Sequence, residues 1–312
     1  MPVLTTPPLA PPQSGAVRGA GSVAAGLVRA ARPKQWVKQV LVLAAPGAAG
    51  VLLHGHALWR TAVAAIVFTL AASGTYMIND ASDVEADRRH PTKCRRPFAS
   101  GQVPVRLGWA VGLTLLIGAP LLGWALATWQ LAVTVAVYVA LTTAYSRRLK
   151  HVAVVELMIV AFGFVLRAIA GAAAVDVPLS QWFVIVASFG SLFMVVGKRY
   201  AEATGLEEGG VASRRILAEY PLPFLRQVRD VSVSVTLLAY CLFAFDRGAE
   251  GTLSLPWFQL SIVPVTLGML RYALLLERGQ GGAPEDVVLH DRTLLLSGLA
   301  WLAVFLLGVA GV

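Results

Sequence analysis

Residues 58–101 read LWRTAVAAIVFTLAASGTYMINDASDVEADRRHPTKCRRPFASG, an apolar segment that runs directly into acids and then into bases. The apolar part, from about Leu58 to Ile78, is long enough to cross a membrane as a helix. The acids follow in the pattern N-D-x-x-D-x-x-x-D, and a basic run extends from Arg88 to Arg96. The stretch therefore predicts a membrane-spanning helix that ends at a polar site on the membrane surface.

Asn79, Asp80, Asp83 and Asp87 are the candidate metal ligands of this site. On a helix, positions 79, 83 and 87 lie on one face, and Asp80 lies beside them. Crowded carboxylates repel one another unless a cation lies between them, and an oxygen-only set suits Mg²⁺, which completes its shell with water and substrate phosphate. Acids beside bases at a membrane surface therefore predict a magnesium–diphosphate site. A solvated loop of mixed charge is the alternative, and the helical spacing of the acids disfavours it.

The rest of the chain has the composition of a membrane protein. Of its 312 residues, 57% are hydrophobic and only 14% are charged, against about 25% charged in a soluble domain. Residues 1–28, rich in Pro, Ala and Gly, are expected to form a disordered tail before a single domain over 29–312. Recurring apolar segments predict an all-α bundle of nine transmembrane helices, at 36–53, 58–78, 105–126, 129–145, 152–175, 180–197, 231–245, 255–276 and 293–311.

The formal net charge of +9 is explained by the placement of the bases. Of the 26 Lys and Arg residues, 23 lie on the N-terminal side of the membrane, before the first expected span, in loops on that side or near the span ends there. Arg60 and Arg247 lie on the other side, and Arg167 lies inside a span. The positive-inside rule then places the N-terminus and the long loops in the cytoplasm, and nine spans place Val312 outside. The partner of these bases is thus a lipid bilayer and not nucleic acid.

Two further polar groups stand out at or within the expected spans. Lys198, Arg199 and Glu202 follow the sixth span in the run GKRYAE, where a basic anchor at the membrane surface is an equally simple explanation. Glu156 and Arg167 lie inside the fifth span, eleven residues apart and on one helix face. Ionisable groups in a span are costly and usually face a cavity or each other. The sequence leaves open whether this pair only fixes packing or contacts substrate.

The segment 79–101 resembles the UbiA superfamily of intramembrane prenyltransferases. Its run RPFASG, residues 96–101, resembles the R-P-x-x-S-G motif of that family. Members have nine helices, a first Asp-rich motif after helix two and a second after helix six. The resemblance covers roughly residues 30–312, and it implies a magnesium-dependent enzyme of the cell membrane with an active site facing the cytoplasm.

One departure from the family pattern concerns the donor substrate. Where ordinary members carry the second acidic motif, this chain reads GKRYAE, so basic groups replace most of the acids. Together with DRRHPTK at 87–93 and YSRRLK at 145–150, this run resembles the branch that moves 5-phosphoribose from phosphoribosyl diphosphate to a polyprenyl phosphate for cell-wall arabinan synthesis. That donor carries two charged groups, a phosphate and a diphosphate, and the acceptor adds a third, so the site needs more fixed positive charge, which Arg and Lys supply.

The resemblance and this chemistry together assign roles to the polar residues. Magnesium on the acids of the first cluster would neutralise the diphosphate as it leaves, and a nearby carboxylate would stabilise a cationic sugar carbon. The expected catalytic residues are Asp80, Asp83, Asp87, Glu156 and Glu202. The expected substrate-binding residues are Asn79, Lys93, Arg95, Arg96, Tyr145, Lys150, Arg167, Lys198, Arg199 and Tyr200.

Two other functions stay open on the sequence alone. A prenyltransferase that joins a prenyl diphosphate to an aromatic or other lipid-soluble acceptor is disfavoured by the missing second acidic motif. A transporter would suit intramembrane charge, but acids at helical spacing beside a surface loop suit metal-bound phosphate better. Assembly into a homo-oligomer, the polyprenyl length and the number of metal ions are not determined by the sequence.

Overall fold

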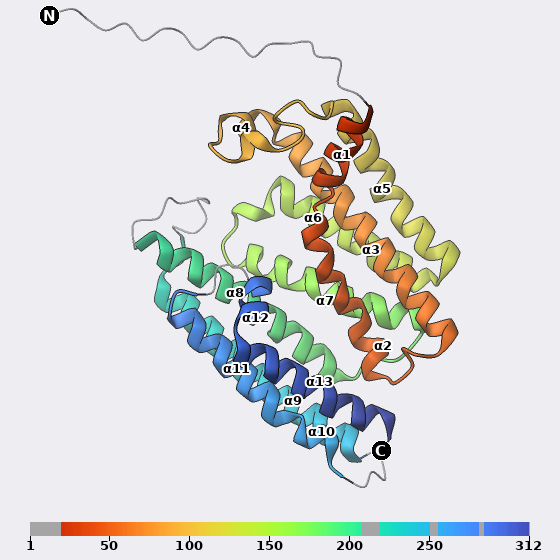
Figure 1. The fold of residues 1–312 in the computed structure, drawn as a ribbon, viewed down its shortest axis with the longest axis vertical. Coiled ribbons are helices and arrows are strands. Elements are labelled where there is room, and N and C mark those ends of the chain that lie inside the picture. Colours follow the sequence, from red (N-terminus) through yellow and green to blue (C-terminus); the bar gives the residue numbers. More distant parts are fainter. Residues whose placement is uncertain (1–19, 208–218, 250–254, 281–283, 312) are drawn as a thin grey trace, which may run out of the picture.

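The computed structural model describes residues 20–207, 219–249, 255–280 and 284–311, and over these residues helices and their connections make up the chain (Figure 1). Eight helical segments are long and apolar enough to cross a membrane, formed by α3, α5, α6, α7, α8, α9, α10 with α11, and α13. The elements are α1 (Ala20–Ala30), η1 (Pro33–Leu43), α2 (Ala44–Ala48), α3 (Gly55–Ser82), α4 (Val84–Arg89), η2 (Lys93–Arg95), α5 (Val105–Leu126), α6 (Trp129–Arg147), η3 (Leu149–His151), α7 (Val155–Val175), α8 (Gln181–Glu207), α9 (Leu222–Ala249), α10 (Trp257–Leu260), α11 (Ile262–Glu277), α12 (Pro284–His290) and α13 (Arg292–Ala310).

Helix α7 lies between the two halves of the bundle and contributes to the apolar core of each. Leu166 packs with Phe68 of α3 in one cluster, and Leu157 packs with Phe193 of α8 in the other. In Figure 1, α3 and α5 lie on one side of α7, and α9, α11 and α13 lie on the other. Because α7 is an apolar membrane span that packs against both halves, its buried polar side chains must find their partners within the protein.

The segment 36–53, expected as the first span, does not form one continuous α-helix. It is built from η1, a 3₁₀ helix of eleven residues, and from α2, which has five. At about 2.0 Å of rise per 3₁₀ residue and about 1.5 Å per α residue, the two together extend roughly 30 Å, close to the thickness of a hydrocarbon core. Both elements pack along α7, where a side chain at Gly171 would overlap the backbone oxygen of Val42.

Two other boundaries differ from the sequence-based expectation. The segment 198–230, expected as the loop between the sixth and seventh spans, is helical at both ends, because α8 runs to Glu207 and α9 begins at Leu222. The seventh span, expected over 231–245 only, is therefore part of a helix of 28 residues. The reason is that the first turns of α9 are amphipathic: Leu225 is buried while the neighbouring charged residues lie at the polar end of the bundle.

The expected disordered tail is wrong over residues 20–28, which belong to α1, while residues 1–19 lie outside the described part of the chain. Alanine-rich segments have high helix propensity. Val23 and Leu27, four residues apart on one helix face, pack against the buried Phe98 and Val103. This contact provides the apolar burial that α1 needs, and it places α1 beside the loop that follows α4.

The close approach of η1 to α7 can be tested at Gly171. Gly171→Ala should lower the free energy of unfolding by about 1–3 kcal/mol, the usual cost of adding atoms to a packed core. Gly163→Ala on the same helix is the matched control, because its added carbon would meet nothing closer than 3.8 Å. Thermal unfolding of both variants in detergent measures the difference. Equal melting temperatures would contradict the packing of η1 on α7.

Candidate functional site

The acids of the first motif lie where α3 gives way to α4. Helix α3 ends at Ser82, and Asp83 caps it with φ −92° and ψ 10°. The backbone ladder nevertheless continues: the Asp83 N–H donates to the Asn79 carbonyl at 3.0 Å, and the Asp87 N–H donates to the Asp83 carbonyl at 2.8 Å. The four residues therefore keep the helix-like spacing that the sequence predicted, with a change of direction in the middle.

Two of these carboxylates are buried and share one arginine. Asp80 and Asp87 are 3% and 4% exposed, and Arg96 Nη1 lies 3.0 Å from Asp80 Oδ1 and 2.8 Å from Asp87 Oδ2. Arg32 donates to the same Asp80 oxygen at 2.7 Å. Two guanidinium groups thus neutralise two buried carboxylates, which would otherwise repel each other.

The run RPFASG positions Arg96. Phe98 is fully buried and fills the space beside Gly108 of α5, where a side chain would overlap its ring. The Ser100 N–H donates to the Arg96 carbonyl at 2.8 Å, and Gly101 takes the left-handed conformation with φ +70°. A buried anchor and a tight turn therefore hold the backbone of Arg96 so that its side chain reaches the acids.

Asp83 and Asn79 lie nearer to solvent than the buried pair. The Asp83 side chain is 38% exposed, and its Oδ2 lies 3.9 Å from Lys150 Nζ of η3. Within the described ranges, no three His, Cys, Asp or Glu side chains come close enough together to hold a metal ion. The oxygen donors suit Mg²⁺ chemically, but the guanidinium of Arg96 lies between Asp80 and Asp87, where a metal ion would have to be.

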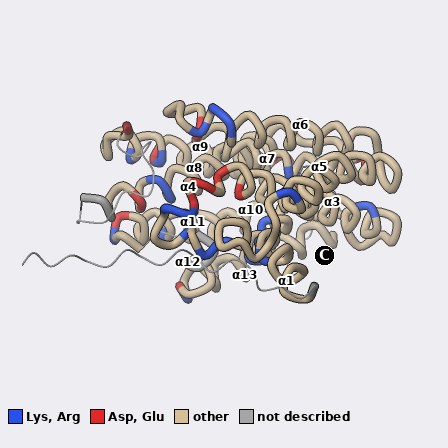
Figure 2. The backbone as a smooth tube through the Cα atoms, turned by 90° about the horizontal axis from the view of Figure 1, so that it is seen from above, with Lys and Arg blue, Asp and Glu red and all other residues tan. Residues whose placement is uncertain are grey.

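A second buried cluster joins α7 to α8. Arg199 donates through Nε to Glu156 Oε1 at 2.9 Å and through Nη2 to Glu156 Oε2 at 3.0 Å. Its Nη1 bonds Glu202 at 2.7 Å. Glu156 is 1% exposed and Arg199 is 4% exposed. Figure 2 shows basic and acidic segments side by side near α4, α8 and α9. The GKRYAE run thus contributes a buried ion pair, and the carboxylate of Glu156 faces Arg199.

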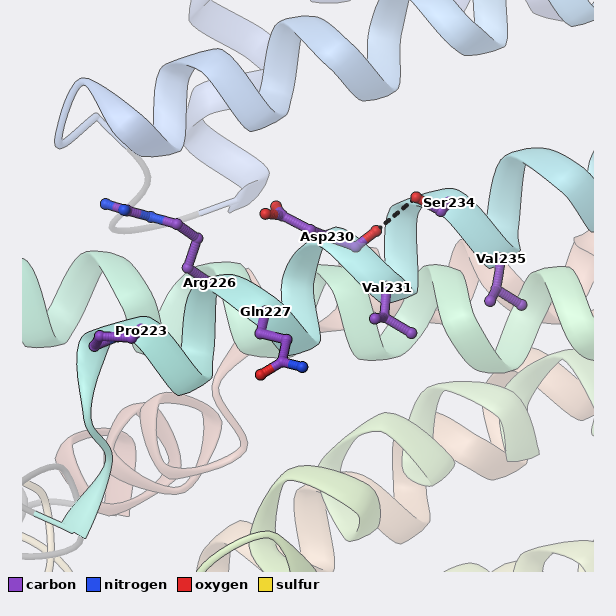
Figure 3. A pocket seen from close by; sticks show the side chains of 7 residues that line it. All are labelled: Pro223, Arg226, Gln227, Asp230, Val231, Ser234 and Val235. Atoms are coloured by element: carbon purple, nitrogen blue, oxygen red, sulfur yellow. Dashed lines mark hydrogen bonds between the residues drawn. The ribbon is translucent and has the colours of Figure 1, made fainter.

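A third set of charged residues, on α9 and α11, surrounds Tyr200 of α8. The Tyr200 hydroxyl donates to Glu277 at 3.1 Å and accepts from Arg226 at 3.0 Å. Arg229 bonds the same Glu277 carboxylate and the neighbouring Asp230. Arg226, Gln227 and Asp230 also line an open groove along α9, with Ser234 bonded to the Asp230 carbonyl (Figure 3). Sequence reasoning missed these partners because it assigned this part of α9 to a loop.

Arg167 does not pair with Glu156, so the structure excludes an ion pair between them as one of the alternatives that the sequence left open. Eleven residues of α-helix separate them by roughly 16 Å along the axis. Arg167 instead bonds Gln39 Oε1 at 3.0 Å, the Gly163 carbonyl at 2.5 Å and the Tyr138 hydroxyl at 3.3 Å. It therefore connects η1, α6 and α7 through neutral acceptors.

The remaining expected substrate-binding residues lie at or near the surface. The side chains of Lys93, Arg95 and Lys198 form no hydrogen bond or ion pair with any described residue, and Arg95 is exposed. Tyr145 is half-buried at the end of α6. Arg32 was missed because its only signal in the sequence was its charge. It adopts the left-handed conformation, with φ 56°, directly before Pro33, and this turns its side chain toward Asp80.

Comparison with known proteins agrees with this fold and identifies the family. A family model described as the UbiA prenyltransferase family matches residues 40–295. The chain is 47% identical over 291 residues to the decaprenyl-phosphate phosphoribosyltransferase of Mycobacterium tuberculosis, covering 90% of this chain and 93% of the relative. It is 44% identical over 293 residues to the protein of the same name from Corynebacterium glutamicum, covering 92% and 88% of the two chains.

Solved structures show the same architecture at low sequence identity. A UbiA homologue from Archaeoglobus fulgidus, solved with DMAPP and Mg²⁺, superposes with a TM-score of 0.68 at 14% identity, over 92% of this chain and all of that one. The chain belongs to the UbiA prenyltransferase family. It is a multi-pass membrane protein of helical architecture.

The buried ion pair of the second cluster predicts unequal effects of removing its two carboxylates. Glu156→Ala should lower the free energy of unfolding by about 3–5 kcal/mol, because it leaves Arg199 buried without its main counter-charge. Glu202→Ala is the matched control: it removes a less buried partner of the same guanidinium and should cost about 1 kcal/mol or less. Thermal unfolding in detergent compares the two. A larger loss from Glu202→Ala would refute the assigned pairing.

Proposed function

We propose that this chain transfers the 5-phosphoribosyl group from phosphoribosyl diphosphate to decaprenyl phosphate or a similar polyprenyl phosphate, for synthesis of cell-wall arabinan precursors. The observation that carries this proposal is the 43–47% identity, over about nine tenths of the chain, to relatives named decaprenyl-phosphate phosphoribosyltransferase. Those relatives and this chain cover each other almost completely, so the proposal concerns the whole protein.

The electrostatics of the second cluster support a donor rich in phosphate. Only two carboxylates, Glu156 and Glu202, belong to this cluster, and both are bonded to Arg199, so the cluster offers a metal ion fewer acids than the three Asp residues of the first cluster. Lys198 lies beside them without a partner in the described ranges. Lys and Arg side chains bind phosphate oxygens through charge-assisted hydrogen bonds. The cluster therefore suits a phosphate group better than a metal-bound diphosphate.

The first cluster supports magnesium at the leaving diphosphate. Asn79, Asp80, Asp83 and Asp87 would hold the ion, which would neutralise the charge that develops as diphosphate departs. In the structure, Arg96 bridges two of these acids. On substrate binding, Arg96 and Arg32 would turn from the carboxylates to phosphate oxygens, so that each charge keeps a partner of opposite sign.

The proposed chemistry is a displacement at the anomeric carbon of ribose. An oxygen of the lipid phosphate forms the new bond to this carbon, and the bond from the carbon to the diphosphate oxygen breaks. The lipid phosphate is already anionic, so no strong base is needed. The difficulty is bringing anions together, and preorganised basic side chains such as Lys150 and Lys198 offset it.

The same proposal includes the orientation in the membrane. With η1 and α2 as a ninth crossing, the ends of α3, α8 and α11 and the starts of α5, α7, α9 and α13 all lie on one side. The unequal distribution of Lys and Arg makes that side the cytoplasm and Val312 external. The active site would then face the cytoplasm of the cell membrane, where the charged donor is soluble, while the polyprenyl tail stays in the bilayer.

A direct assay tests the reaction. Purified protein is incubated with labelled phosphoribosyl diphosphate, decaprenyl phosphate and Mg²⁺, and labelled lipid is extracted. A parallel reaction contains labelled dimethylallyl diphosphate and an aromatic acceptor, the alternative suggested by the structural relatives. Labelled lipid in the first reaction alone, lost with EDTA, is the expected result. Product in the second reaction alone would replace the proposal with prenyl transfer.

Lys198 is expected to bind phosphate of the sugar donor. Lys198→Ala should raise the KM for phosphoribosyl diphosphate roughly ten- to hundred-fold, the effect of losing one charged hydrogen-bonding group, with little change for the lipid. Arg106→Ala is the matched control, because Arg106 is an exposed base at the start of α5, on the same proposed side of the membrane. If donor KM changes by less than twofold in both variants, Lys198 is only an anchor at the membrane surface.

The orientation is tested with a single cysteine at Ser100, an exposed residue of the loop between α4 and α5. Cys94 and Cys241 are first replaced by serine to remove the native thiols. A membrane-impermeant maleimide should label the cysteine of the Ser100→Cys variant only after the cells are opened. Labelling in intact cells would place this loop outside and reverse the proposed topology.

A further inference from the structure

The backbone directly before α7 contains a strained turn at Val154. Val154 has φ 66° and ψ −47°, and the Val155 N–H donates to the Ala153 carbonyl at 2.8 Å. A bond from residue i+2 back to residue i, with positive φ at the central residue, defines a γ-turn of the rare and strained type. For a β-branched residue this conformation is an outlier, because its side chain crowds the backbone.

One side chain from a distant segment holds this turn. The Tyr220 hydroxyl accepts a hydrogen bond from the Val154 N–H at 2.8 Å. Tyr220 is 6% exposed, and its ring stacks on Phe224 of α9 with an angle of 4° between the ring planes. Burial is the largest influence on the Tyr220 phenol and raises its pKa above the ordinary value, so the group stays neutral at physiological pH. The buried hydroxyl is therefore a fixed acceptor for the Val154 amide.

The turn separates two parts of the candidate site. On one side, η3 carries Lys150, which lies 3.9 Å from Asp83 of the first cluster. On the other side, Glu156 begins α7 and holds Arg199 of the second cluster through two hydrogen bonds. Only the turn and its neighbours connect Lys150 to Glu156 along the chain. Its shape therefore sets where Lys150 lies relative to Glu156.

We infer that Tyr220 is a positioning residue: it holds the γ-turn at Val154 and thereby sets the spacing between Lys150 and the Glu156–Arg199 pair. Strained conformations persist only where the surrounding structure over-determines them, and they concentrate at functional sites. Without the phenolic acceptor, the Val154 amide loses its partner and the turn relaxes to negative φ. The chain then moves Lys150 relative to α7, and both clusters no longer meet one substrate in the required geometry.

Four variants of the full-length protein test this role, which rests on the proposed phosphoribosyl transfer for its kinetic part. Tyr220→Phe should lower kcat about tenfold or more, because small misplacements of substrate-contacting groups are costly, while the KM for the lipid acceptor stays within about twofold. Glycine accepts positive φ without strain, so Val154→Gly added to Tyr220→Phe should restore kcat to within about threefold of wild type.

Val152→Gly added to Tyr220→Phe is the matched control. Val152 lies in the same connection and is similarly exposed, but it has an ordinary φ of −106°, so glycine there should not restore kcat. Tyr240→Phe removes a buried, hydrogen-bonded hydroxyl that belongs to a different core cluster from Tyr220, and it should leave kcat within about twofold of wild type. Rescue by Val154→Gly but not by Val152→Gly supports a positioning role. No rescue by Val154→Gly, or full activity of Tyr220→Phe alone, overturns it.

Thermal unfolding of the same variants, together with Val154→Gly and Val152→Gly alone, gives a readout that does not depend on the reaction. The destabilisation caused by Tyr220→Phe should shrink in the presence of Val154→Gly and persist with Val152→Gly. Additive effects of Tyr220→Phe and Val154→Gly would overturn the coupling between hydroxyl and turn. Absence of phosphoribosyl transfer by the wild-type protein, with this coupling intact, would instead count against the proposed function alone.

Discussion

Charge buried among apolar helices has to be neutralised locally, and this requirement organises the polar end of the bundle. Moving a carboxylate or a guanidinium out of water is costly unless a partner of opposite charge and good geometry is present. The structure meets this requirement with guanidinium groups. Arg32 and Arg96 neutralise Asp80 and Asp87, and Arg199 neutralises Glu156 and Glu202. Apart from Arg199–Glu202, which lies within α8, each pair joins different segments of the chain, so the same contacts define the site and hold its helices together.

Helix α7 shows how packing and electrostatics combine. Its apolar faces belong to both halves of the core, and its two ionisable residues each connect it to other elements. Glu156, at its first turn, binds Arg199 of α8, and Arg167, deeper in the bundle, binds Gln39 of η1. A cluster built from paired charges can exchange one anion for another, because a phosphate can take the place of a carboxylate at a guanidinium group. Such an exchange is consistent with a site that handles several phosphates.

Much of the helical framework could be predicted from hydropathy. The expected spans 58–78, 105–126, 129–145, 152–175 and 180–197 correspond to α3, α5, α6, α7 and α8. The prediction of one continuous α-helix at 36–53 was wrong, because periodicity does not show that Gly171 lets η1 approach α7 closely. The loop expected at 198–230 was wrong for a similar reason. The charged residues in the first turns of α9 favoured the prediction of a loop, because the sequence does not show that they pair with Glu277 of α11.

The sequence by itself determined the membrane class of the protein, the position of the acidic and basic clusters along the chain, and the helical spacing of Asn79, Asp83 and Asp87. These depend on composition and on neighbours in sequence. Only the tertiary structure decided which charges pair, that Asp80 shares Arg96 with Asp87, that Arg167 avoids Glu156, and that Tyr220 holds Val154. Pairing depends on distances between segments far apart in the chain, and these distances are set by packing.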